Sequence, residues 1–227
     1  GAKHGILIKN AEVLETLQKV DTLVVDKTGT LTEGQPRLTE CVPAADYSEA
    51  ELLQIAASVE QHSEHPLSQA VVVAAKEREL KLSEVSDFDS VTGAGVKGTV
   101  NGKAVLIGSA SFLQDQSIHI KDELNSRADR LREEGQGVIF VAIANEFAGF
   151  LSVSDPIKET TAQAIQKLHE LGLSIVMMTG DNEKTARAVA KSLNIDDVEA
   201  GVKPQDKYEK IKALRNAGHK VAMAGDG

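Results

Sequence analysis

Residues 22–32 read TLVVDKTGTLT, a short apolar run that ends at Asp26 in a polar turn containing Gly29. Two later stretches have the same design, residues 173–178 before the turn TGD and residues 220–224 before the turn GDG. Continuous apolar runs of this length are typical of strands buried on both faces of a parallel sheet. The three turns would then lie at the carboxyl ends of neighbouring strands, where open α/β sheets bind their ligands.

Helical patterns separate these runs, at residues 158–171, 184–193 and 205–216. Regular alternation of strands and helices predicts an α/β fold with a doubly wound parallel sheet.

The stretch from about residue 33 to residue 149 breaks this alternation. It carries helical patterns at residues 48–59, 67–80 and 121–134, glycine-punctuated strand signals at 91–107, and an apolar run at 138–144. We therefore expect a discontinuous domain, residues 1–32 and 150–227, with an α+β domain, residues 33–149, inserted into one of its loops.

The composition excludes several classes of protein. The 25 basic and 34 acidic residues give a net charge of −9, which argues against a nucleic-acid partner. The single cysteine, Cys41, excludes an internal disulfide and a multi-cysteine metal cluster. The apolar runs fall far short of the ~18–20 residues of a membrane helix, so we expect this stretch to be soluble. Because the sequence stops straight after a strand-like run, we interpret its end as cut from a longer chain.

Asp26 is expected at the end of the first strand, next to the cationic Lys27 and the flexible Gly29. A carboxylate held beside positive charge stays ionised and can attack an electrophilic phosphorus as a covalent nucleophile. Taken alone, such an aspartate would more often cap a turn. Asp181 and Asp226 close two other predicted strands, so three carboxylates are expected at one edge of the sheet. Because unpaired carboxylates repel, this arrangement favours a divalent cation among them.

The string DKTGTLT at residues 26–32 resembles the phosphorylation signature of P-type ATPases, which belong to the haloacid-dehalogenase-like superfamily. Further motifs of that family follow in the expected order: Asp155-Pro156, Thr179-Gly180-Asp181, KPQDK at residues 203–207 and GDG at residues 225–227. The resemblance covers essentially the whole chain. It implies a phosphorylation domain with an inserted nucleotide-binding domain, ATP and Mg²⁺ as cofactors, and a place at the cytosolic face of a membrane. Transmembrane and actuator domains of the same polypeptide are implied as partners.

The resemblance also implies a role for each motif residue. Asp26 would accept the phosphoryl group, and Mg²⁺ would be bound by the Asp26 carboxylate, the Thr28 carbonyl and Asp226. Thr179 and Gly180 would hold the phosphoryl oxygens. These roles agree with phosphoryl-transfer chemistry, which depends mainly on positioning and on positive charge around the equatorial oxygens.

Four further residues complete the implied catalytic region. Lys207 would neutralise the charge of the phosphoryl oxygens. Lys27 lies next to the nucleophile in the sequence. Asp155 and Asp181 would support the site or face the nucleotide.

Thr28 separates this sequence from related phosphatases of the superfamily, which carry an aspartate two positions after the nucleophile. That aspartate acts as general acid and base in hydrolysis, and a hydroxyl transfers protons poorly near neutral pH. We therefore expect a phosphoenzyme that persists.

The expected insert contains the cluster EQHSEHP at residues 60–66. Its histidines, His62 and His65, could suggest zinc, but no third ligand is obvious and the spacing differs from that of zinc hydrolases. The motif with Glu64 and His65 resembles instead the Ser-Glu-His-Pro motif of heavy-metal P-type ATPases. In that class, the residues corresponding to His65 and Glu60 contact the adenine end of ATP.

Gly93, Gly95 and Gly98 superficially match a dinucleotide-binding motif, but a hairpin pattern follows where that motif needs a helix. In the heavy-metal family, glycines at 93 and 95 let the nucleotide lie against bare backbone. Gly98 completes the glycine-rich segment assigned to the nucleotide. Ser109 stands where the family commonly has an asparagine that helps to bind the nucleotide, so a lower ATP affinity or a bridging water is expected.

The transported ion is not encoded in this stretch. Copper(I) export is the first expectation by family frequency, with zinc or cadmium as alternatives and a metallochaperone as a partner of the intact protein. Two other functions stay open: a free-standing phosphatase of the same superfamily and a non-catalytic nucleotide-binding module. Thr28 and the Ser-Glu-His-Pro motif oppose the first, and the joint presence of Asp26, Lys207 and Asp226 opposes the second.

Overall fold

The computed structural model describes residues 19–44 and 46–225. The chain divides into two compact units, one formed by Gly1–Gln35 with Asp155–Gly227 and the other by Pro36–Ser154. Asp226, an expected metal ligand, lies outside the described residues.

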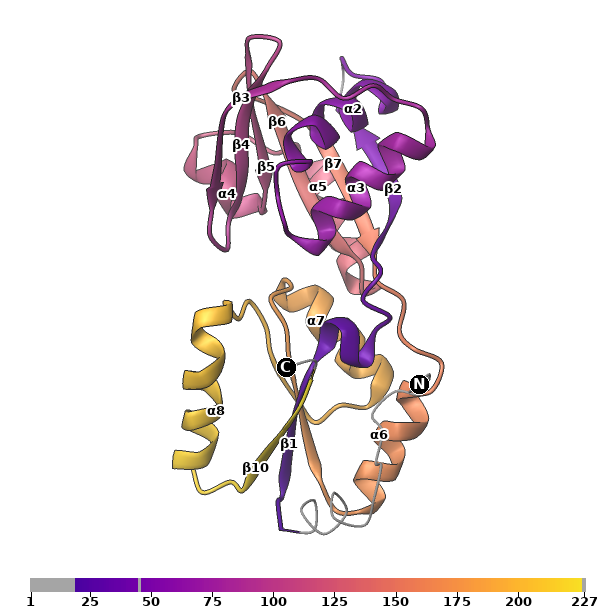
Figure 1. Cartoon of the computed structure of the whole chain (residues 1–227), viewed down its shortest axis with the longest axis vertical. Coiled ribbons are helices and arrows are strands. Elements are labelled where there is room, and N and C mark those ends of the chain that lie inside the picture. Colours follow the sequence, from indigo (N-terminus) through magenta and orange to yellow (C-terminus); the bar gives the residue numbers. More distant parts are fainter. Residues whose placement is uncertain (1–18, 45, 226–227) are drawn as a thin grey trace. The chain divides into compact units, whose positions relative to one another are not determined.

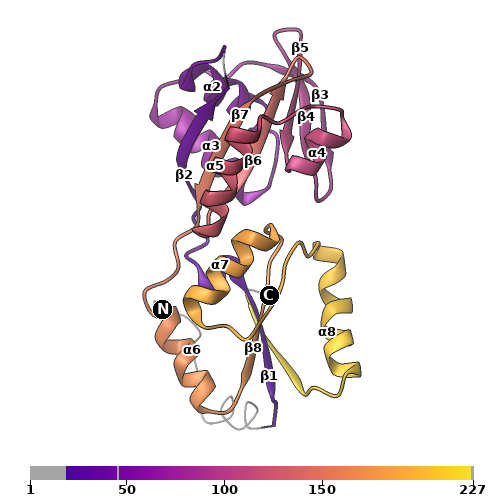
Figure 2. The same cartoon turned by 180° about the vertical axis from the view of Figure 1, so that it is seen from behind.

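The first unit contains a four-stranded parallel sheet with the strand order β10-β1-β8-β9. Its strands are β1 (Thr22–Asp26), β8 (Ser174–Met178), β9 (Asp197–Glu199) and β10 (Val221–Ala224). Its helices are α6 (Thr161–Glu170), α7 (Glu183–Leu193) and α8 (Lys207–Asn216). The sheet has α6 and α7 on one face and α8 on the other, as both views show (Figures 1 and 2). The expected doubly wound α/β fold is confirmed.

Alternating side chains of β1 explain why its run is wholly apolar. Leu23 and Val25 pack against the α6 and α7 side, whereas Val24 lies in the cluster that contains Ile211 of α8. Because successive residues of a strand point to opposite faces, a sheet covered on both sides needs apolar residues at every position.

The second unit is a six-stranded antiparallel sheet with the strand order β2-β7-β6-β5-β4-β3. Its strands are β2 (Arg37–Pro43), β3 (Val85–Val91), β4 (Gly95–Val100), β5 (Lys103–Gly108), β6 (Gly137–Ile143) and β7 (Glu146–Ser154). Its helices are α2 (Glu49–Glu60), α3 (Pro66–Glu77), α4 (Ala110–Asp115) and α5 (Asp122–Glu133). Helices α2 and α3 cover one face, and α4 and α5 cover the other (Figure 2). This is the expected α+β insert.

The division into units differs slightly from the expected boundaries. Strand β7 runs to Ser154 and pairs with both β2 and β6, so residues 150–154 belong to the insert. Residues 33–35 belong to the first unit, where the Glu33 N–H donates to the Pro156 carbonyl. In the part of the chain that the structure describes, no helix is long and apolar enough to cross a membrane.

Candidate functional site

Asp26 ends the central strand of the parallel sheet, between the ends of β8 and β10. It pairs in register with Met178, so Thr179 follows at the neighbouring strand end. On the other side, a Cβ placed on Gly225 would lie 2.5 Å from Asp26 Oδ2. Only glycine fits there without displacing the carboxylate.

Lys207 brings a positive charge to this carboxylate from a distant part of the sequence. It is the first residue of α8, directly after the short helix Pro204–Asp206. Its Nζ donates to Asp26 Oδ2 at 2.6 Å. Both side chains remain about one-third exposed, at 30% for Lys207 and 27% for Asp26, so the pair is accessible from solvent. A short charge-assisted hydrogen bond of this kind is stronger than a neutral one and orients the carboxylate.

The turn after Asp26 is closed by Thr32. Its N–H donates to the Lys27 carbonyl at 3.1 Å, and its hydroxyl accepts the Gly29 N–H at 3.2 Å. Gly29 has φ +80°, a conformation that favours glycine, and Thr28 is extended and exposed.

Asp155, the first residue of the second chain segment in this unit, stabilises this turn. Its Oδ2 accepts the Thr32 hydroxyl at 2.5 Å, and its Oδ1 accepts the Gln35 N–H at 3.1 Å. Both carboxylate oxygens are therefore engaged by the segment that carries Thr28. These two hydrogen bonds give Asp155 a structural role that does not require a bound nucleotide.

Lys27 does not face Asp26. Its buried ammonium group contacts Asp181 Oδ2, so two strand ends are joined by an ion pair. The Asp181 N–H donates to the Thr179 hydroxyl at 3.1 Å, and its carbonyl accepts the Gly201 N–H at 2.9 Å. These bonds shape the turn that contains Gly180.

The structure thus places the predicted catalytic residues at one edge of the sheet: Asp26, Lys27, Thr28, Thr179, Gly180, Asp181 and Lys207. Asp26 and Asp181 are each paired with a lysine. Repulsion between unpaired carboxylates therefore does not apply to these two. Within residues 19–44 and 46–225, no group of three or more His, Cys, Asp or Glu side chains is arranged to hold a metal ion.

The second unit carries the other predicted residues. Glu60 ends α2 and is 4% exposed. Burial raises the pKa of its carboxyl to about 7, and a hydrogen bond from Ser68 of α3 acts in the opposite direction. Among the described residues, Glu60 Oε2 has no hydrogen-bond partner.

His65 is the N-cap of α3, followed by Pro66 at the first helical position. Its Nδ1 accepts the Leu67 N–H at 3.2 Å, and the Ser63 hydroxyl accepts the His65 N–H at 3.2 Å. An accepting Nδ1 leaves the proton of the neutral ring on Nε2. The His65 and Glu64 side chains are exposed.

Close packing of the backbone explains why glycine occupies two of the predicted positions, independently of a nucleotide. Gly95 pairs with Gly108 of β5, and a Cβ on Gly95 would lie 2.1 Å from the Ile107 carbonyl oxygen. A Cβ on Gly98 would meet Val85 at 2.6 Å. Because these two glycines are three residues apart on one strand, they face opposite sides of the sheet. Gly93 has φ +74° in the turn before β4.

Ser109 is the N-cap of α4, and its hydroxyl accepts the Phe112 N–H at 3.1 Å. Its own N–H donates to the Ala94 carbonyl at 3.0 Å. This bond brings Ser109 next to the turn that contains Gly93. Gly108 lies beside the same turn, paired with Gly95. Gly108 was not identified from the sequence as part of this region, although it directly precedes Ser109.

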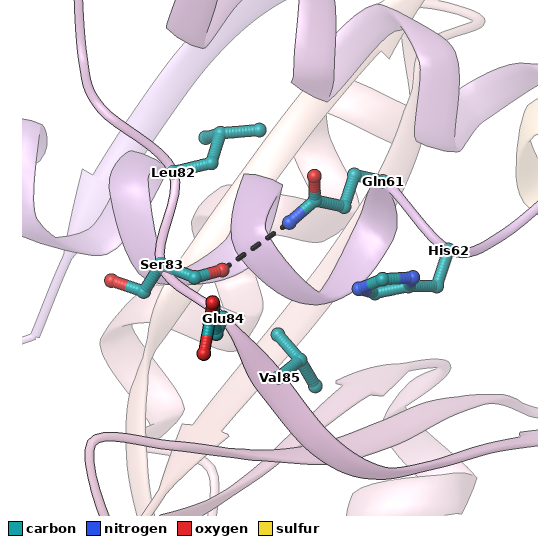
Figure 3. A pocket seen from close by; sticks show the side chains of 6 residues that line it. All are labelled: Gln61, His62, Leu82, Ser83, Glu84 and Val85. Atoms are coloured by element: carbon teal, nitrogen blue, oxygen red, sulfur yellow. Dashed lines mark hydrogen bonds between the residues drawn. The ribbon is translucent and has the colours of Figure 1, made fainter.

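The loop after α2 borders a shallow groove of about 380 Å³ (Figure 3). It is lined by Gln61, His62, Leu82, Ser83, Glu84 and Val85. The Gln61 amide donates to the Ser83 carbonyl at 3.3 Å, and the His62 ring lies 5.5 Å from the Phe88 ring. These contacts fix the loop that begins after Glu60, but no predicted site residue lines the groove.

Comparisons with known proteins agree with this arrangement. A family model described as haloacid dehalogenase-like hydrolase matches residues 20–227. The chain is 50% identical over 227 residues to the silver exporting P-type ATPase of Salmonella typhimurium and to the copper-transporting P-type ATPase of Rhizobium leguminosarum bv. viciae. All of this chain matches, but it spans only 27% of the length of each of these relatives.

Two groups of solved structures share the fold. The catalytic domain of the CPx-ATPase CopB-B, studied for its conformational changes upon nucleotide binding, is 33% identical, with a TM-score of 0.71. The match covers 98% of this chain and 77% of that domain. A zinc-transporting PIB-type ATPase in its E2.Pi state is 38% identical, with a TM-score of 0.62, over all of this chain and 36% of that one.

Proposed function

Because the chain belongs to the haloacid dehalogenase-like hydrolases and, within them, to the catalytic domains of CPx-type ATPases, we propose that it binds ATP and is phosphorylated on Asp26. It would do so as the cytosolic part of a heavy-metal-transporting P-type ATPase. The observation that carries the proposal is the 2.6 Å contact between Asp26 Oδ2 and Lys207 Nζ at the carboxyl end of the central strand.

In the proposed reaction, a carboxylate oxygen of Asp26 attacks the γ-phosphorus of ATP. A bond forms between that oxygen and phosphorus, the bond to the β,γ-bridging oxygen breaks, and ADP leaves with the electron pair. Lys207 balances the negative charge of the transferred group, and Thr179 with Gly180 would donate hydrogen bonds to its oxygens. Lys27 acts indirectly: its ion pair with Asp181 positions the turn that contains Gly180.

The oxygen donors at this edge suit Mg²⁺, which prefers carboxylates and carbonyls. The Asp26 carboxylate and the Thr28 carbonyl belong to the described residues, and Asp226 would be the third protein ligand. When bound, the metal would supply positive charge next to the phosphoryl oxygens.

The buried Glu60 oxygen supports nucleotide binding by the second unit. An unpartnered buried acceptor is costly and is relieved by a ligand donor such as the adenine amino group. We propose that Glu60 and His65 contact the base, with Glu64 beside them. Gly93, Gly95, Gly98 and Ser109 would border the same nucleotide, and Asp155 would support the phosphorylation turn rather than touch ATP.

Labelling with γ-³²P-ATP tests the proposal. The wild-type chain should acquire acid-stable label, and Asp26→Asn should lose the label while its ATP affinity stays near wild type. Asp21→Asn, at the opposite and exposed end of β1, is the matched control and should keep the label. Label on the Asp26→Asn variant would refute the assignment of the nucleophile.

For the intact protein, we propose copper(I) as the transported ion. The relatives that are 50% identical are named for silver and copper, whereas the zinc-transporting structure is 38% identical. Copper(I) and silver(I) are both soft cations that share thiolate ligands. Phosphorylation of the intact protein should respond to copper(I) and silver(I) more than to zinc or cadmium, and to a metallochaperone that delivers copper(I). A response to zinc alone would overturn this choice.

A further inference from the structure

Two lysines of α8, one helical turn apart, reach the carboxyl end of the parallel sheet. Lys207 Nζ donates to Asp26 Oδ2 at 2.6 Å, and Lys210 Nζ lies 3.4 Å from Glu199 Oε2. Glu199 is the last residue of β9, and neither it nor Lys210 has a role in the proposed reaction. Residues three apart on a helix are neighbours on its surface, with Cβ atoms about 5–6 Å apart. Both lysines therefore project from the same side of α8.

The two carboxylates lie in one row of the sheet. Asp26 of β1 pairs in register with Met178 of β8, and Met178 pairs with Glu199 of β9. Side chains that pair in register point to the same face, and strands ~4.8 Å apart place the first and last residue of this row about 10 Å apart. Met178, between them, is 2% exposed and lies in the cluster that contains Ile211 of α8. The shared face is thus the one that α8 covers.

Helix α8 is attached to this row by an ion pair on each side of an apolar contact. Apolar contacts are non-directional, so the packing of Ile211 alone does not fix the rotation of α8 about its axis. Two ion pairs about 10 Å apart do fix it. The Lys207 side chain is a flexible four-carbon stem, and the position of its ammonium group depends on how the helix turn beneath it is oriented.

The ion pair between Lys210 and Glu199 adds little to stability. The side chains are 47% and 34% exposed, and exposed ion pairs are weak. The backbone of Glu199 has a separate contact, because its carbonyl accepts the Thr179 N–H at 3.0 Å. Substitution of the Glu199 side chain removes the ion pair and leaves this backbone bond. Its effect on Lys207 can therefore be measured in a folded chain.

We propose that Glu199 is a positioning residue for phosphorylation, which binds Lys210 and thereby orients α8 so that Lys207 meets Asp26. The inference rests on the proposed function, in which Lys207 balances the charge of the transferred phosphoryl group. It adds that this lysine depends on a second ion pair across the sheet. Catalytic geometry loosened by about 1 Å can cost roughly a hundredfold in rate, so a small rotation of α8 is enough to slow the transfer.

Acetylation by N-hydroxysuccinimidyl acetate, quantified by mass spectrometry, measures the contact between Lys207 and Asp26 without ATP. Lys212, exposed on the same helix, is the internal reference. The acetylation of Lys207 relative to Lys212 should rise about two- to fivefold in Glu199→Gln and in Lys210→Met, the scale of one exposed ion pair. Asp26→Asn, which removes the partner charge directly, should give a rise at least as large. An unchanged ratio in Glu199→Gln and Lys210→Met would overturn the inference, whether or not the chain is phosphorylated.

The rate of labelling with γ-³²P-ATP tests the consequence. Glu199→Gln and Lys210→Met should each acquire label about five- to tenfold more slowly, with ATP affinity and urea unfolding close to wild type. The double variant should be no slower than the slower single variant, because one pair is lost in each case. Lys210→Arg keeps the charge and should keep most of the rate. Asp197→Asn, exposed on the same strand as Glu199, is the matched control and should behave as wild type.

The outcomes separate the inference from the proposed function. Losses that multiply in the double variant, or Lys210→Arg as slow as Lys210→Met, would overturn the positioning role. Faster acetylation of Lys207 in Glu199→Gln with an unchanged rate of labelling would support the positioning and contradict the role of Lys207 in the proposed reaction. The same rise in acetylation in a chain that acquires no label at all would support the positioning and contradict the proposed function alone.

Discussion

The ammonium group of Lys27 contacts the Asp181 carboxylate across two strand ends, although Lys27 directly follows Asp26 in the sequence. The Lys27 side chain is 8% exposed and that of Asp181 is 19% exposed. Removing one partner of such a pair costs more than the pair contributes, because the other charge stays buried without compensation. The two residues should therefore respond unequally to substitution.

Asp181→Asn should destabilise the first unit by about 2–4 kcal/mol, because it leaves the buried lysine without a counter-charge. Lys27→Met should cost less, since Asp181 is nearer to solvent and can turn to water. The double variant should be more stable than the sum of the two losses by about 1 kcal/mol or more. Urea unfolding followed by circular dichroism measures all three, and equal, additive losses would contradict the pairing.

Thr28 offers a test of phosphoenzyme lifetime. Its side chain is exposed and its backbone extended, two residues after the proposed nucleophile. Thr28→Asp introduces a general acid and base there and should speed the decay of labelled phosphoenzyme by about tenfold or more. A chase with unlabelled ATP measures the decay. Thr28→Asn is the control, because asparagine has the shape of aspartate but cannot transfer protons, and its phosphoenzyme should decay like that of the wild type. Equal decay of the Asp and Asn variants would exclude proton transfer from this position.

The sequence predicts the parallel sheet well because burial on both faces requires the apolar runs of β1 and β8, and β10 carries a similar apolar run although it is only partly buried. The convergence of Asp26, Thr179 and Lys207 at one edge follows from that topology. The partner of Lys27 could not be predicted, since adjacency in the sequence suggested Asp26. Side chains that follow one another out of an extended strand point in different directions, so Lys27 faces another strand end.

Strands β2 and β3 of the insert escaped prediction for another reason. Both lie at the edges of the antiparallel sheet, where one side of the strand has no neighbour. Their sequences, RLTECVP and VSDFDSV, contain charged residues and a proline, which edge strands tolerate and central strands do not. The packing roles of Gly95 and Gly108 were also hidden, because they depend on which residues face each other across β4 and β5.

The stability of the second unit should depend on pH through Glu60. Its pKa in the folded chain is about 7, above the ordinary value of 4.5, so its contribution is fully present below pH 4.5 and is lost as pH rises through 7. The whole loss is on the order of 3 kcal/mol. Glu60→Gln has no such loss and should gain stability relative to wild type between about pH 5 and pH 8. Urea unfolding at several pH values tests this, with Glu77→Gln as a control; parallel curves for wild type and Glu60→Gln would show that the carboxyl is not desolvated in the folded chain.

Ser109 allows the nucleotide role to be separated from the structural role. Its hydroxyl caps α4 by accepting the Phe112 N–H at 3.1 Å, so Ser109→Ala should lose about 1 kcal/mol of stability. Asparagine is an equally good cap, so Ser109→Asn should stay within about 0.5 kcal/mol of wild type. Its longer side chain also carries an amide with both donors and an acceptor, which reaches further toward a nucleotide beside Gly93.

We therefore expect Ser109→Asn to bind ATP about two- to fivefold more tightly, which corresponds to part of one hydrogen bond. Ser111→Ala is the matched control. Ser111 is exposed on the same helix, and its Oγ lies 3.1 Å from the Ser109 Oγ. Isothermal titration of the three variants, with unfolding curves for each, distinguishes the outcomes. Tighter binding with unchanged stability would place position 109 at the nucleotide, whereas an affinity that follows stability alone would reduce Ser109 to a helix cap.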